Sequence, residues 1–217
     1  MSRFFSLDNP VILFLSRITD LILLSILWII CCIPIVTIIP STSALYYITL
    51  KMVRNEDSRL AVSFFRAFAD NLKKGTVLSI VLELIGILIY VDYLLSGMVD
   101  GGIGTVLRIF FLILCITYCA FFHYTAALQA KFENTIVQTM KNAVILLLRF
   151  FGKTLRILII NATPIALVLL FPELTHRILP IWIILVPATV VFLCAKQFVL
   201  VFDKVLAIQN EPDTQDE

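Results

Sequence analysis

Four polar side chains stand inside long apolar segments of the sequence, where ionisable and amide groups are rare. Glu83 follows Thr76 by seven residues, and Lys196 precedes Asp203 by the same number. If these segments cross a membrane from one surface, a rise of about 1.5 Å per helical residue places both charges roughly 10 Å deep. An acid and a base at one depth can neutralise each other, or bind a proton, an ion or a polar solute.

His123 and Asn161 belong to two further apolar segments and fall near the same depth. We therefore predict a buried polar layer of Glu83, His123, Asn161 and Lys196, in which Glu83 pairs with Lys196. Two roles stay open: a structural clamp that fixes the register of the helices, or a site for a transported ion or solute. Lys196 can also extend its ammonium group to the nearer membrane surface.

Composition indicates that a membrane surrounds the elements that position these residues. Hydrophobic residues make up 60% of the 217 and charged residues 15%, against about half and a quarter in soluble domains. Four segments can cross about 30 Å of hydrocarbon, and a fifth is shorter. They are residues 18–39, 76–95, 105–128 and 178–202, with the shorter one at 155–171.

We expect an all-α fold, a polytopic membrane helix bundle with five to six membrane-embedded helices and two cytoplasmic amphipathic helices. Residues 1–208 are predicted to form a single helical transmembrane domain. Residues 209–217 are polar and acidic, which predicts a disordered tail.

Basic residues set the expected orientation, because loops rich in Lys and Arg stay in the cytoplasm. Segments 51–74 and 131–156 are basic, whereas 96–104 has no Lys or Arg and 172–177 has only Arg177. The first two are therefore expected inside and the other two outside. The basic segments also resemble each other as a weak internal repeat. Each enters the cytoplasm, forms an amphipathic helix and returns.

Two prolines interrupt the first apolar region within "IPIVTIIP", residues 33–40. Each lacks a backbone donor and disfavours helix at the preceding residue. We predict a proline turn of Pro34, Thr37 and Pro40 at the outer side, followed by a short, partly unwound helix packed inside the bundle. Six helices with both termini in the cytoplasm follow from this turn. The alternative has five spans and an external amino terminus.

Residues 60–72 form the first amphipathic segment. Its apolar face carries Leu60, Phe64, Ala67, Phe68 and Leu72. Such a helix can lie at the lipid headgroups with its aromatic side chains buried, or dock on a cytoplasmic partner. The residues expected to contact the membrane surface or a partner are Phe64, Phe65, Arg66 and Phe68.

Motifs that carry catalysis are missing from the sequence, which contains neither HExxH nor GxSxG. The five cysteines lie in apolar segments without a CxxC pair, so they are expected to pack as small hydrophobic side chains. We therefore expect no enzyme, no catalytic residues, no metal and no cofactor. Membrane topology accounts for the basic loops without a nucleic-acid partner.

The stretch from Asp20 to Thr76 resembles the YesL-like family, domain of unknown function 624, of bacterial integral membrane proteins. The resemblance is carried by "LLSILWIICCIPIVTIIPSTSALYYITLKMVRNED" and "FFRAFADNLKKGT" and is looser thereafter. The chain departs from the family pattern at Ile39, where members often have glycine, and at Ser41 and Ser43, which replace alanine.

Members of this family are typically encoded beside carbohydrate ABC importers and polysaccharide-degrading enzymes in Gram-positive bacteria. The resemblance implies a non-enzymatic accessory protein of carbohydrate uptake in the cell membrane, which contacts the lipid bilayer and the permease subunits of such an importer. It assigns no catalytic residues. A small transporter that uses the buried polar layer is an alternative, as is a membrane sensor or scaffold that regulates carbohydrate utilisation.

Overall fold

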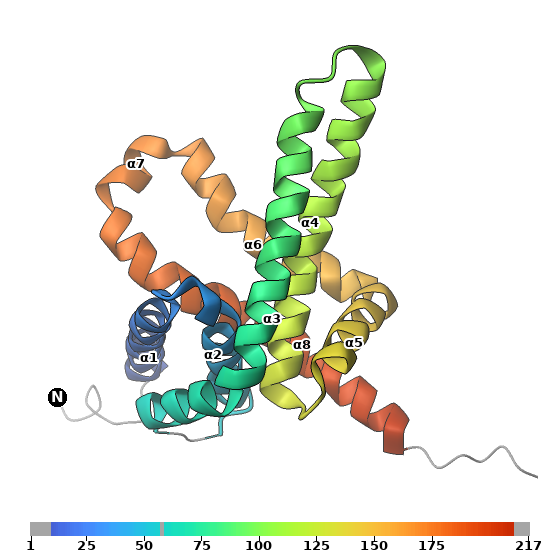
Figure 1. The fold of residues 1–217 in the computed structure, drawn as a ribbon. Coiled ribbons are helices and arrows are strands. Elements are labelled where there is room, and N and C mark those ends of the chain that lie inside the picture. The colour runs from blue at the N-terminus through green and yellow to red at the C-terminus, as the bar shows by residue number, and fades with distance from the viewer. Residues whose placement is uncertain (1–9, 57–58, 211–217) are drawn as a thin grey trace, which may run out of the picture.

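The computed structural model describes residues 10–56 and 59–210, and these residues are helical without a strand (Figure 1). Within this part, six helices are long and apolar enough to cross a membrane. This confirms the predicted all-α membrane bundle. The helices are α1 (Pro10–Cys32), α2 (Ile38–Val53), α3 (Leu60–Ser96), α4 (Gly101–Lys131), α5 (Ile136–Arg149), α6 (Phe151–Leu170), α7 (Pro172–Arg177) and α8 (Leu179–Asn210), with a 3-10 turn, η1 (Ile35–Thr37), after α1.

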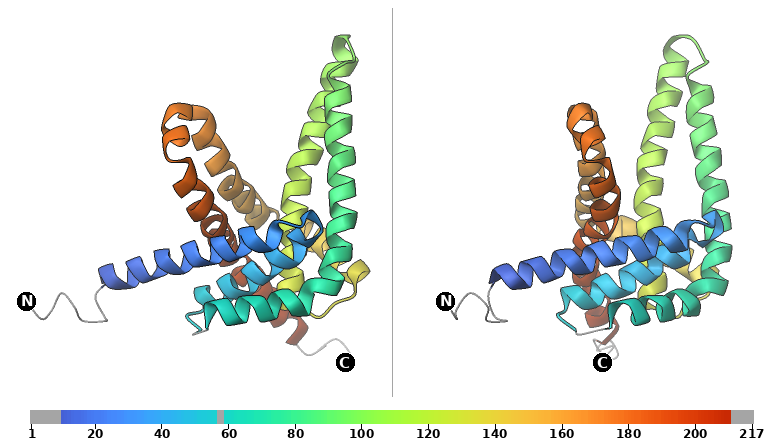
Figure 2. Two further views of the ribbon diagram at one scale, coloured as in Figure 1. Left: turned by 60° about the vertical axis from the view of Figure 1, so that its left-hand side comes forward. Right: turned by 90° about the vertical axis from the view of Figure 1, so that its left-hand side faces the viewer.

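Two arms rise from a common base, which we define as the end of the molecule where α3 begins, α5 lies and α8 ends (Figure 1). The hairpin arm consists of α3 and α4, and the arch arm of α6, α7 and α8. Both views of Figure 2 show the arms apart above the base, with the 97–100 loop and α7 at the far ends. The two basic segments therefore lie at one end of the molecule and the two loops poor in Lys and Arg at the other.

Helix α2 is the centre of the bundle and packs against α1, α3, α4 and α8. Of its apolar window 72% is buried, whereas the figure for α4 is 6%. Ser41, Ser43 and Ala44 are small and fully buried, which lets neighbouring helices approach closely. At Gly75 of α3, an added Cβ would lie only 2.9 Å from Pro40 Cδ. The prediction of a second helix packed inside the bundle is confirmed, but α2 is a regular helix from Ile38 to Val53 and is not partly unwound.

The two prolines have different roles. Pro34 precedes η1, where the Thr37 hydroxyl donates to the Cys31 and Pro34 carbonyls, at 2.6 Å each. Pro40 lies in the first turn of α2, where a missing N–H removes no helical hydrogen bond. The turn therefore spans residues 33–37 and is shorter than predicted, because Pro40 is compatible with a helix start.

The proline turn lies beside the middle of α3 and not at the level of the 97–100 loop. The Ile39 N–H donates to the Ser79 hydroxyl at 2.8 Å. Ser79 precedes the end of α3 at Ser96 by 17 residues, or about 25 Å of helical rise. Helix α1 accordingly crosses the hairpin arm (Figure 2). This corrects the expectation of a turn level with the two outer loops, although the chain does reverse direction, since Arg17 donates to Asn55 Oδ1 at 2.9 Å.

The two amphipathic segments are built differently. Residues 60–72 are helical but continue without a break into the membrane span as the 37-residue α3, whose first turns lie across the base (Figure 2). Helix α5 is separate and begins at a capping box, in which Gln138 N–H donates to Thr135 Oγ1 at 3.3 Å. Helix α8 extends to Asn210, beyond the expected boundary at 208, and the remainder of the predicted tail lies outside the described residues.

Proline inside α8 is compensated from α1. Pro187 interrupts the helical hydrogen bonds of α8, and the N–H of Ala188 donates instead to Ser25 Oγ at 3.1 Å. Membrane helices tolerate proline where a serine or threonine of a neighbour takes up the freed backbone group. This bond joins the first long helix of the chain to the last.

Candidate functional site

Half of the predicted polar layer assembles in the structure. His123 of α4 is 9% exposed, and its Nδ1 shares a 2.7 Å hydrogen bond with the Tyr46 hydroxyl of α2. Asn161 of α6 lies beside His123. Its amide donates to the Ile157 carbonyl at 2.8 Å and to Cys194 Sγ at 3.5 Å. These bonds join α2 to α4 and α6 to α8, and the clamp role considered for the layer stays a prediction.

The other half does not assemble, and the predicted pairing of Glu83 with Lys196 is wrong. Lys196 is exposed on α8, where its Nζ lies 5.0 Å from the Phe192 ring centroid. Glu83 is half-buried on α3, and its Oε1 atom has no hydrogen-bond partner among the described residues. The salt bridge found within those residues joins Arg54 to Asp203. The reason is spatial, because α3 belongs to the hairpin arm and α8 to the arch arm.

The four residues predicted for a surface or a partner point in two directions. Phe64 is fully buried and Phe68 is half-buried, so both pack on the core. Phe65 is 49% exposed and Arg66 is also exposed. Only the second pair is accessible to a membrane surface or a partner.

The start of α3 carries a second apolar face, which we call the outer stripe. Its residues follow the three- and four-residue spacing of one helix face and are exposed, two of them strongly: Val62 (65%), Phe65 (49%), Ala69 and Leu72 (38%). Sequence analysis assigned Leu72 to the buried face and missed this stripe. The signal was present in the spacing, but two overlapping apolar faces cannot be ranked without the packing.

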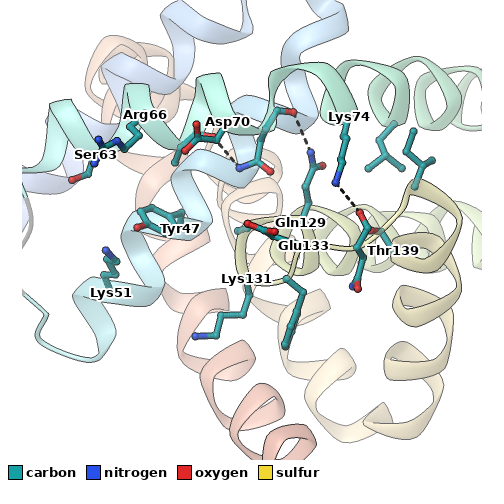
Figure 3. A pocket seen from close by; sticks show the side chains of 17 residues that line it. Tyr47, Lys51, Ser63, Arg66, Asp70, Lys74, Gln129, Lys131, Glu133 and Thr139 are labelled. Carbon is teal, nitrogen blue, oxygen red and sulfur yellow. Dashed lines mark hydrogen bonds between the residues drawn. The ribbon is translucent and has the colours of Figure 1, made fainter.

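A cavity of about 570 Å³ opens at the base, which we call the base cavity (Figure 3). Its walls come from the end of α2, the first turns of α3, the end of α4 and the start of α5. Of the residues predicted for a site, only Arg66 contributes to it. The ionised wall residues are the cations Lys51, Arg66, Lys74 and Lys131 and the carboxylates Asp70 and Glu133.

The sequence indicates one wall of the base cavity, the side that α3 contributes. Ser63, Arg66, Asp70 and Lys74 follow one another at spacings of three and four residues, so α3 presents them on one side. Sequence analysis used the basic residues of this segment only to predict membrane topology. That three other segments close around this face depends on tertiary packing.

Cysteine and metal chemistry adds no site in the described part of the chain. All five cysteines are free thiols, and Cys31 and Cys194 are buried as packing side chains. Across residues 10–56 and 59–210, no three His, Cys, Asp or Glu side chains are arranged to hold a metal ion.

Six apolar helices, one of them the buried, serine-containing α2, define a polytopic helical membrane protein. Residues 21–93 match the family described as Protein of unknown function, DUF624. The match includes the second half of α1, all of α2 and nearly all of α3, so the resemblance to the YesL-like family is confirmed over this region. Neither the curated proteins nor the solved structures gave a match to the chain.

Proposed function

We propose that the protein is a non-enzymatic accessory subunit of carbohydrate uptake, which associates in the cell membrane with the permease subunits of a carbohydrate ABC importer. The observation that carries the proposal is the outer stripe, an exposed apolar surface within the family-matched residues 21–93. The choice of partner is supported by the gene neighbourhoods that the YesL-like resemblance implies for Gram-positive bacteria.

The outer stripe suits a docking role because it is held rigidly. Phe64 and Ala67 are 0% and 5% exposed and anchor the opposite side of the same turns in the core. A preorganised helix face loses little conformational entropy when a partner binds. Exposed Arg66 and Lys73 flank the stripe and favour a partner surface that carries carboxylates.

The base is proposed to face the cytoplasm, with both termini on that side. The basic segments 51–74 and 131–156 meet at the base, as the preference of Lys and Arg for cytoplasmic loops requires. Arg17 near the start of α1 bonds to Asn55 in the loop before α3, and α8 ends at the base (Figure 1). The outer stripe then lies where a permease exposes its cytoplasmic loops.

Affinity purification of the tagged protein from its native membranes tests the proposal. We expect permease subunits to co-purify, and the recovered amount to fall about tenfold or more in Phe65→Ser, the loss typical of a central aromatic contact. Phe151→Ser is the matched control, because Phe151 is 67% exposed at the start of α6 and lies outside the stripe. Equal recovery with both variants, or no permease at all, would contradict docking through the stripe.

A solute-uptake assay on liposomes that contain only this protein tests the transporter alternative. Its proposed layer is already divided, since Glu83 and Lys196 lie on different arms. Solute uptake by the protein alone would nevertheless favour transport over an accessory role. With neither uptake nor a permease partner, a sensor or scaffold becomes the better explanation.

A further inference from the structure

The charged side chains in the wall of the base cavity do not form ion pairs with one another. Four wall residues are cations and two are carboxylates, and no wall cation comes within 4.0 Å of a wall carboxylate oxygen. Among the described residues, the Lys74 ammonium donates to the Asn134 carbonyl at 3.4 Å, whereas the side chains of Lys51, Arg66 and Lys131 make no hydrogen bond. The Lys51 ammonium lies 4.5 Å from the centroid of the Tyr47 ring. Charged side chains that are not paired with one another remain available to a charged ligand. The open volume between them leaves room for such a ligand.

The groups are arranged in order along the cavity (Figure 3). Arg66 and Lys51 lie toward one end, with Tyr47 and Ser63, and Lys74 and Thr139 lie toward the other. The carboxylates of Asp70 and Glu133 come between these ends in this view. A ligand that spans the cavity therefore meets cations and hydrogen-bond acceptors in succession.

Gln129 contributes a buried amide to the cavity wall. Its side chain is 9% exposed, and its Nε2 donates to the Asn71 carbonyl at 3.2 Å. The other amide atom, Oε1, is buried and has no partner among the described residues. An unmet buried acceptor costs about 1–3 kcal/mol.

We propose that the base cavity binds a phosphate ester that carries free hydroxyl groups. Lys51, Arg66 and Lys131 hold the phosphate, and Asp70 and Glu133 accept from the hydroxyls. Arginine and lysine are the side chains that bind phosphate oxygens. The two carboxylates repel any phosphate, but a hydroxylated ester offsets this repulsion by donating hydrogen bonds to them, which a bare phosphate does not.

Two sources could supply this chemistry. One is an anionic phospholipid with a glycerol headgroup, since basic pockets between membrane helices on the cytoplasmic side bind lipid headgroups. The other is a soluble hydroxylated phosphate such as glycerol 3-phosphate. The proposal requires the shared chemistry and holds for either source. It is independent of the permease partner, because the outer stripe and the cavity are tested with different residues.

The test uses the full-length protein in lipid nanodiscs. In phosphatidylcholine nanodiscs, glycerol 3-phosphate and inorganic phosphate are titrated separately by calorimetry. In a second series, native mass spectrometry compares retention of phosphatidylglycerol with that of phosphatidylcholine, which carries phosphate without free hydroxyls. Retention of phosphatidylglycerol alone supports a lipid ligand, and binding of glycerol 3-phosphate alone supports a soluble one. Binding of neither overturns the proposal.

Charge variants identify the site. The double variant Lys51→Gln with Lys131→Gln is expected to weaken binding about tenfold or more, because two charge-assisted contacts are lost. Lys141→Gln with Lys204→Gln is the matched control, since it removes the same charge from exposed positions outside the cavity. If both double variants lose affinity equally, general electrostatic attraction replaces the site and the proposal fails.

Asp70→Asn tests the hydroxyl contacts separately. Removing this carboxylate lowers the repulsion of bare phosphate and weakens the acceptor for a hydroxyl. We expect the preference for the hydroxylated ester over inorganic phosphate to shrink several-fold, because the lower repulsion strengthens the binding of both anions alike whereas the weaker acceptor affects only the ester. An unchanged or larger preference would contradict the assigned role of the carboxylates.

Discussion

Helices α2 and α4 are both candidate membrane spans, yet their surroundings are opposite. Protein covers 72% of the apolar window of α2 and 6% of that of α4. Helix α2 contains Ser41, Thr42 and Ser43 in succession, all buried, whereas the outer half of α4 exposes isoleucine, leucine and phenylalanine side chains. In a membrane protein, the helix surrounded by protein can therefore be less apolar than the helix that faces lipid.

Packing explains this inversion. Lipid tails are as apolar as leucine, so a helix gains little by exchanging lipid for another apolar helix. Small and hydroxylated side chains contribute more at helix contacts, because they allow close approach and bond to backbone groups. Ile39 and Ser79 show such a bond between α2 and α3, and Trp28 Nε1 donates to Thr42 Oγ1 at 3.1 Å between α1 and α2. The exposed α4 needs only to remain helical and soluble in lipid.

The largest effect is expected from truncating an aromatic side chain in α2. Tyr46→Ala removes a fully buried ring that packs on Phe198 at 5.4 Å and bonds to His123. The free energy of unfolding in mixed micelles should fall by about 3–5 kcal/mol. Tyr90→Ala is the control, since Tyr90 is 57% exposed, and it should cost under about 0.5 kcal/mol. Similar losses would break the contrast between covered and exposed helices.

Adding a side chain at the close contact between α3 and α2 should have the next largest effect. In Gly75→Leu, the new side chain meets Pro40 Cδ at 2.9 Å and Gln129 Nε2 at 2.8 Å from the Cβ position. Forcing α2 and α4 away from α3 should lower the midpoint of chemical unfolding by the equivalent of about 1–3 kcal/mol. Gly152→Leu has open space around its Cβ and serves as the control. A Gly75 variant as stable as that control would refute tight packing of α2.

A smaller loss is expected when a backbone bond between helices is removed. Ser25→Ala leaves the Ala188 N–H of α8 without its acceptor, at a cost of about 1–2 kcal/mol. Ser25→Thr retains the hydroxyl and should recover most of the stability. Thr163→Ala removes a hydroxyl that bonds only within its own exposed helix, and its thermal unfolding should match wild type. Full stability of Ser25→Ala would show that lipid or water replaces the serine.

The smallest effect is expected for the residues that the sequence paired and the structure separates. Glu83→Gln and Lys196→Met should combine additively, with a coupling energy below about 0.5 kcal/mol, because their helices lie on different arms. A double-mutant cycle on unfolding free energies measures this directly. Coupling above about 1 kcal/mol would mean that the arms close and bring the two charges together.

Sequence patterns were sufficient to predict features that depend on one helix alone. Segment length and apolarity predicted the spans, and the apolar spacing of Phe64 and Ala67 predicted the buried face at the start of α3. The depth of a residue along its helix was a weaker predictor of contacts between helices. The sequence predicted one depth for Glu83 and Lys196, but contact also requires that their helices be neighbours and face each other.

His123 and Asn161 succeed where that pair fails, because α4 and α6 do touch. The orientation of α1 also could not be predicted from the sequence. Pro34 predicts a turn, whereas the bond from Ile39 to Ser79 fixes where the turn lies, and no local pattern contains it. The base cavity likewise depends on Lys51, Arg66 and Lys131, which come from three distant segments.

The bond between Ser25 and Ala188 has a consequence for biogenesis. The two residues are 163 positions apart, and a ribosome that adds about 5–20 residues per second needs roughly 8 to 33 s to cover that distance. During that interval α1 is already available for insertion while its partner on α8 has not been made. The first helix must therefore wait in the bilayer, and the finished bundle can close only after the last helix leaves the ribosome.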